Sequence, residues 1–174
     1  MAKVSFNKLN LKINDDIKNI IWNEENIEIK QYLPVNKKLE IVSNVINICG
    51  QDGKFYNPGK IEIYFTLEMI YNYTNIKFTD KQKEDVVKLY DILQSSELKQ
   101  EIFDIIPPEE VEFIYTTIID TIENIYKYNN SAYGILDSVV NDYDGLNFDA
   151  NEIYQKIANG ENVEFLKEVM AKLG

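Results

Sequence analysis

The side chains that most enzymes use for proton transfer and metal binding are nearly absent from this chain of 174 residues. It contains no histidine, no arginine and one cysteine, Cys49. Zinc sites are built from thiolate and imidazole ligands, and serine or cysteine nucleophiles usually need a histidine base. Cys49 also falls near the end of a predicted helix, where the helix dipole disfavours a thiolate. We therefore interpret Cys49 as a buried packing residue and predict neither a metal site nor a bound cofactor.

Two short motifs resemble ligand-binding loops but lack essential positions. Residues 50–55 (GQDGKF) have glycines too close together for a phosphate loop, and Phe55 replaces the hydroxyl that would hold magnesium. Asp142, Asp144 and Gly145 match part of a calcium loop, but its first and twelfth positions would hold a valine and an asparagine. We discard the first motif and interpret the second as an ordinary Asp/Gly turn.

Carboxylates are the one catalytic group that the chain has in quantity. Glycoside hydrolysis needs only a pair of acids roughly 5 to 10 Å apart. Sugar-binding clefts also use stacking aromatics, and the only tryptophan, Trp22, falls in a predicted hairpin. We therefore expect a protein that is not an enzyme.

The negative charge is concentrated in the second half of the chain. Residues 1–96 hold 13 lysines and 13 acids, whereas residues 97–174 hold 5 lysines and 16 acids, which accounts for the whole net charge of −11. Such a field favours association with a basic protein and repels nucleic acid and anionic membranes. No run of about 18 apolar residues is present, so we predict a cytoplasmic protein with no membrane and no nucleic-acid partner.

The expected fold is mainly α, a helical bundle with an N-terminal β-hairpin. Residues 4–11 look extended, and the apolar runs 20–22 and 27–32 flank a four-residue loop at 23–26. Alternation places Ile27 and Ile29 on one face, and Pro34 ends the strand. We assign residues 1–34 to the hairpin region and 35–174 to a helical domain, and we expect them to form one folding unit.

Helical periodicity takes over after Pro34. Leu39, Val42, Val45 and Ile46 define one face of a helix that ends at Gly50. Residues 60–74 indicate a buried helix, with the start of a strand at 61–64 as the alternative. Thr79 and Gln82 make a capping box, and Ser96 is a candidate cap for a helix that ends at residue 106. Residues 109–142 keep one helical phase and form either one helix or two helices with a break at 129–134. Two further helices are predicted, one between an acidic cap at Asp149 and a stop at Asn159, and one at 163–173.

Tyrosine is the most conspicuous aromatic residue, with 12 copies. Tyr64 and Tyr71 lie seven residues apart, as do Tyr126 and Tyr133, so each pair shares one side of a helix. Such tyrosines can pack in the core with their hydroxyls at its rim, or they can contact a partner, because interfaces favour tyrosine. Both interpretations stay open. The candidate partner-binding residues are Trp22, Tyr32, Tyr64, Tyr71, Tyr126, Tyr133, Glu109, Glu110 and Glu112.

The order of these segments resembles that of small phage and prophage proteins described as tail assembly chaperones. The resemblance rests on residues 27–35 (IEIKQYLPV), 57–58, 67–68, 75–79 (NIKFT) and 166–174 (LKEVMAKLG). It implies a non-enzymatic protein that binds the tape-measure or tail-tube protein in the host cytoplasm, and it offers no catalytic residues. Apart from the resemblance, we keep a homo-oligomer as a further partner hypothesis. Two alternatives remain: an acidic, DNA-mimicking inhibitor of a host defence enzyme, and a minor neck or tail component of the virion.

Overall fold

The computed structural model describes residues 3–50, 56–131 and 134. The chain divides into two compact units, Met1–Ile119 and Asp120–Gly174. The described part is mainly α-helical with one small antiparallel sheet near the N-terminus, which confirms the predicted fold class. Tyr133, the Asp/Gly turn at 142–145 and the two helices predicted after residue 150 lie outside the described residues. No helix of the described part is long and apolar enough to cross a membrane.

The first ordered element is a short 3-10 helix, η1 (Phe6–Leu9), so the extended structure predicted for residues 4–11 is wrong there. The C-cap of the helix is Asn10, which adopts the left-handed conformation with φ 49°. None of its residues is buried. Alternating apolar residues favour a strand only where one face is covered, and this segment has no such cover among the described residues.

The predicted hairpin is present, but its turn is shorter than expected. Strands β1 (Ile17–Trp22) and β2 (Glu25–Lys30) are antiparallel, with Trp22 opposite Glu25. Only Asn23 and Glu24 form the turn, both at positive φ (48° and 70°), as the two-residue turns that match strand twist require. The four-residue loop was wrong because residues 25 and 26 join β2. The prediction that Ile27 and Ile29 share one face is confirmed, and that face is buried, with 6% and 0% of their surface exposed.

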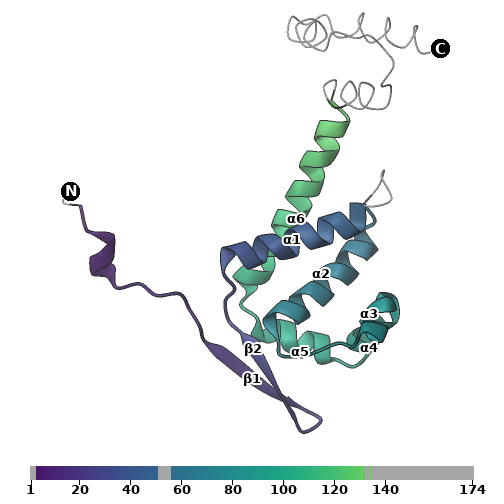
Figure 1. Cartoon of the computed structure of the whole chain (residues 1–174), viewed down its shortest axis with the longest axis horizontal. Helices are drawn as coiled ribbons and strands as arrows, with labels where there is room; N and C mark the ends of the chain where they lie inside the picture. The colour runs from purple at the N-terminus through teal and green to yellow at the C-terminus, as the bar shows by residue number, and fades with distance from the viewer. Residues whose placement is uncertain (1–2, 51–55, 132–133, 135–174) are drawn as a thin grey trace, which may run out of the picture. The chain divides into compact units, whose positions relative to one another are not determined.

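Two helices of sixteen residues, α1 (Val35–Gly50) and α2 (Pro58–Tyr73), pack together and hold most of the core (Figure 1). The helix that was one of two possibilities for residues 60–74 is the observed structure, and the Asn57 side chain caps its N-terminus. Leu39 was wrongly placed on the core face of α1, because it is 47% exposed. The residues that α1 buries are Lys38, Ile41, Val42, Val45 and Cys49.

The capping box of Thr79 and Gln82 is confirmed at the start of α3 (Asp80–Glu84), and Asp85 then caps a separate α4 (Val86–Ser95). The cap predicted at Ser96 is wrong. Ser96 closes α4, and Glu97 precedes α5 (Leu98–Ile105) with φ 64° and no side-chain cap.

The long helix predicted from residue 109 begins at Pro108 and ends at Asn129 as α6. Asn130 and Ser131 form a turn, and their amides donate to the carbonyls of Tyr126 and Tyr128. The break therefore falls in the polar stretch where helix propensity is weakest. Near its start α6 buries Ile114 and Ile118.

Candidate functional site

The predicted tyrosines of the first compact unit, Tyr32, Tyr64 and Tyr71, do not lie on a single element. Tyr64 and Tyr71 are half-buried on α2, and the Tyr71 ring meets Phe78 edge-on at 5.1 Å between ring centroids. The Lys83 ammonium lies 4.9 Å from the Tyr71 ring centroid. Tyr126 is exposed on α6, and Trp22 and Tyr32 are half-buried at opposite ends of the hairpin. Within the first unit, Trp22 and Tyr32 therefore belong to the hairpin region, and Tyr64 and Tyr71 belong to α2.

The three predicted acids of α6 fall into two different environments. Glu109 and Glu112 are exposed and line a shallow hollow together with Phe113. Glu110 is 5% exposed and points into the protein. Because neighbouring residues of a helix point about 100° apart, adjacent acids can serve a surface and a core at once.

Glu110 lies at the centre of a buried polar cluster that joins four elements of the chain. The ammonium of Lys38 on α1 donates to its Oε1, and the Tyr73 hydroxyl on α2 donates to its Oε2 at 2.8 Å. The backbone N–H of Leu33, just after the hairpin, donates to Oε2 at 3.0 Å. The Lys38 ammonium also lies 4.4 Å from the Tyr32 ring centroid. The carboxylate thus ties the hairpin exit, α1 and α2 to the start of α6.

The protonation of Tyr73 follows from this arrangement. Burial is the main cause that raises the pKa of Tyr73 far above its usual value. The hydrogen bond that Tyr73 donates to Glu110 and the negative charge of Glu110 raise this pKa further. The phenol therefore stays protonated and serves as a donor. Because Tyr73 keeps its proton, it cannot act as a general base. Its hydroxyl serves instead as a hydrogen-bond donor within a buried network that holds the fold together.

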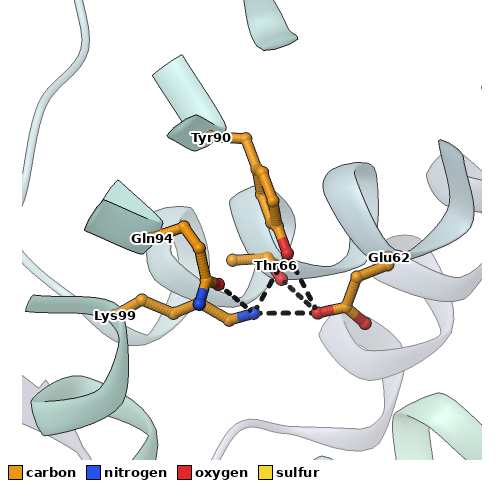
Figure 2. A network of polar contacts seen from close by, with 5 residues as sticks. All are labelled: Glu62, Thr66, Tyr90, Gln94 and Lys99. Carbon is orange, nitrogen blue, oxygen red and sulfur yellow. Dashed lines mark hydrogen bonds and ion pairs between the residues drawn. The ribbon is translucent and has the colours of Figure 1, made fainter. Parts of the chain in front are cut away.

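A second polar cluster links α2, α4 and α5 (Figure 2). The Lys99 ammonium donates to Glu62 Oε1 at 2.8 Å, to the Tyr90 hydroxyl at 3.3 Å and to Gln94 Oε1 at 3.0 Å. The Thr66 hydroxyl also donates to Glu62. Burial alone would lower the pKa of Lys99, but the hydrogen bonds to Glu62 and Tyr90 outweigh it and raise that pKa. Lys99 remains an ammonium ion that connects three helices.

Neither cluster offers an obvious reaction centre. Both lack a histidine, and their charged groups are paired within the protein. Within residues 3–50, 56–131 and 134, no group of three or more Cys, Asp or Glu side chains is arranged to hold a metal ion. Both clusters link elements of the fold through paired charges.

The most distinctive surface feature is a row of large apolar side chains before and within β1. We call this set the apolar row, and each member is at least half exposed: Val4, Phe6, Leu9, Leu11, Ile13, Ile17 and Ile21. Folded proteins seldom leave so many large apolar residues exposed in one short segment unless they contact a partner. The sequence predicts extended structure for residues 4–11, but it does not predict that the apolar side chains there stay exposed.

A hollow of about 450 Å³ lies where the apolar row meets the hairpin exit. Its apolar wall includes Ile13, Ile17 and Leu33, and its polar rim carries two acids and two lysines: Asp15, Asp16, Lys30 and Lys37. Such a mixed lining suits an amphipathic side chain with an aliphatic stem and a charged head. The apolar row and this hollow form the candidate functional site.

Comparison of the chain with protein-family models, curated proteins and solved structures found no match.

Proposed function

We propose that this protein is a non-enzymatic assembly factor that binds another protein, and that it acts as a phage tail assembly chaperone for the tape-measure or tail-tube protein. The observation that carries the proposal is the apolar row, with seven large side chains exposed within the first 21 residues. The resemblance of residues 27–35 and 75–79 to such chaperones supplies the biological setting.

The apolar row has the physical properties that a chaperone surface requires. An assembly chaperone must cover apolar segments of its client until they reach their final partners. Burying an apolar side chain releases about 25 cal/mol for each Å² removed from water, so several half-exposed residues supply enough energy for reversible binding. A separate folded core, built on α1 and α2, leaves these residues available to a client.

The charge of the chain supports a role in binding a protein client. The net charge of −11 limits association with other acidic molecules and speeds encounter with a basic surface. Binding driven partly by this field should weaken as salt screens it, because the Debye length shortens to about 8 Å at physiological ionic strength.

The direct test is co-purification with the tape-measure and tail-tube proteins encoded in the same genome. We expect at least one of them to co-purify at low salt and to stay soluble only in the presence of this protein. A variant with Phe6→Ser, Leu11→Ser and Ile13→Ser should lose the client. The matched control carries Val87→Ser and Ile92→Ser, two exposed apolar positions on α4, and should retain it.

Other outcomes would replace the proposal. If neither protein co-purifies at low salt, the chaperone function is wrong. Inhibition of a host nuclease without client binding would favour the acidic inhibitor. Detection of the protein by mass spectrometry in purified virions, at a fixed copy number, would favour a neck or tail component.

A further inference from the structure

The two edges of the hairpin are treated differently by the rest of the protein. The outer edge of β2 is covered, because the Asn75 side chain accepts from the Glu28 N–H at 3.2 Å and donates to the Asn26 carbonyl at 3.2 Å. Thr74 forms a bridge with Ile29 beside it. The amide of Asn75 therefore takes the place that a neighbouring strand would occupy.

The outer edge of β1 has no such cover in the described part of the chain, where β2 is its only paired strand. The Gln31 N–H donates to the Asp16 carbonyl at 3.0 Å, which fixes the hydrogen-bonding parity of the ladder. Since the pattern alternates, Lys18, Ile20 and Trp22 bond inward to β2. The N–H and C=O groups of Ile17, Asn19 and Ile21 point outward.

Exposed apolar side chains accompany these open backbone groups. Ile17 and Ile21 belong to the apolar row and flank Asn19 on the face of the hairpin that is not buried. An added strand would gain main-chain hydrogen bonds along the edge and apolar contacts on this face. Strand addition to a sheet edge uses the same two contributions.

The charges at the two ends of β1 indicate which kind of partner strand would pair with its edge. β1 is bracketed by acids at both ends, Asp15 and Asp16 before it and Glu24 and Glu25 after its last residue, and all are exposed. No described residue forms an ion pair with any of these acids. A strand with an apolar centre and lysine or arginine at both ends would complement this pattern.

A second copy of the chain fits the edge poorly. An antiparallel pair with Asn19 opposite Asn19 would place Ile17 opposite Ile21, which is favourable. The same register brings Asp15 and Asp16 of one copy beside Glu24 of the other at both ends. Like charges at neighbouring cross-strand positions are destabilising, and here the repulsion occurs twice.

We propose that the free edge of β1 binds an extended segment of a partner protein as an added β-strand, and that this segment has alternating apolar residues flanked by lysine or arginine. The hollow beside Ile13 and Ile17, whose rim carries Lys30 and Lys37 as well as Asp15 and Asp16, receives a side chain of the segment against its apolar wall. The identity of the partner protein rests on the proposed function. The kind of segment that binds rests on the backbone groups and charges of the β1 edge alone.

The test uses the full chain and a synthetic peptide, so that it does not depend on the tape-measure or tail-tube protein. The probe is Lys-Lys-Val-Thr-Val-Thr-Val-Lys-Lys, and its control replaces all four lysines with glutamate. Residue-resolved amide hydrogen exchange should show the outward amides of Ile17, Asn19 and Ile21 slowed about tenfold by the basic peptide. The acidic peptide should leave them unchanged.

Two further variants separate backbone pairing from other contacts. Asn19→Pro removes an outward N–H that makes no bond to β2, and it should weaken peptide binding about tenfold. Asn19→Ala keeps that N–H and should bind as the wild-type protein does. Backbone N-methylation of the peptide at every valine, or at both threonines, leaves the protein untouched, and one of the two sets should abolish binding.

Three results would overturn the inference: unprotected outward amides, equal binding of the two peptides, or tolerance of both N-methylated sets. The outward amides of β1 could instead become protected as the protein concentration rises without peptide, and lose this protection in Asn19→Pro. That result would identify a second copy of the chain as the occupant of the edge and would also refute the inference. If the peptide fails but the tail proteins co-purify, the chaperone function stands without the strand. If the peptide binds and the tail proteins do not, the edge site stands without that function.

Discussion

Replacing Glu110 with alanine should destabilise the protein strongly, although the substitution changes only one of 29 acidic residues. The change removes the partner of the buried Lys38 ammonium and the acceptor of the Tyr73 hydroxyl and the Leu33 N–H. Breaking a buried ion pair from one side costs about 3–5 kcal/mol, mainly because the other charge is left unpaired. We therefore expect Glu110→Ala to lower the free energy of unfolding by about 3–5 kcal/mol.

Urea unfolding followed by circular dichroism measures this effect. Glu112→Ala is the matched control, because Glu112 is exposed on the same helix, and it should stay within about 0.5 kcal/mol of the wild-type value. The double variant Lys38→Met, Glu110→Gln should lose much less than the sum of its single variants, since it leaves no unpaired charge. Two results would refute the view that the Lys38–Glu110 pair links these elements. One is a loss of unfolding free energy below about 1 kcal/mol for Glu110→Ala, and the other is a double variant whose loss equals the sum of its single variants.

Three further predictions concern single positions. Glu24 occupies the left-handed region at φ 70°, so Glu24→Gly should raise the free energy of unfolding by about 0.5–1 kcal/mol; a loss in urea unfolding would contradict this. Burial raises the pKa of Glu68 despite two hydrogen bonds from asparagines, so the folded state binds its proton more readily than the unfolded chain. Stability from this group therefore falls as pH rises above the ordinary glutamate pKa of about 4.3, so the stability of Glu68→Gln relative to the wild type should rise over the same range; a constant difference would contradict it. Burial also raises the pKa of the Cys49 thiol, so a thiol reagent should label Cys49 only as the protein unfolds, and rapid labelling in native buffer would exclude this.

Local patterns predicted much of the fold because they depend on neighbouring residues. The capping box at Thr79 and the alternation of Ile27 and Ile29 both involve contacts within a few residues, and both are confirmed. The buried pair of Lys38 and Glu110 was not predicted, since its partners lie 72 positions apart. A lysine in the buried phase of α1, aligned with Ile41 and Val45, was the available signal.

The candidate site was less predictable for a related physical reason. Periodicity shows that apolar residues share a face, but it does not show whether another element covers that face. Phe6 and Leu9 therefore suggested a strand, whereas the structure leaves them exposed on a 3-10 helix. The free edge of β1 depends on Asn75 covering the opposite edge, and that contact crosses 47 positions from Glu28.

The central claim is that this protein works by binding a partner through the exposed apolar residues near its N-terminus. The most direct measurement is the affinity of the tape-measure or tail-tube protein for two variants with the same substitution, Ile21→Thr in β1 and Ile92→Thr on α4, where the residues are 69% and 55% exposed. We predict that Ile21→Thr weakens binding about tenfold while Ile92→Thr leaves it unchanged. Equal affinities for the wild-type protein and both variants would contradict the account.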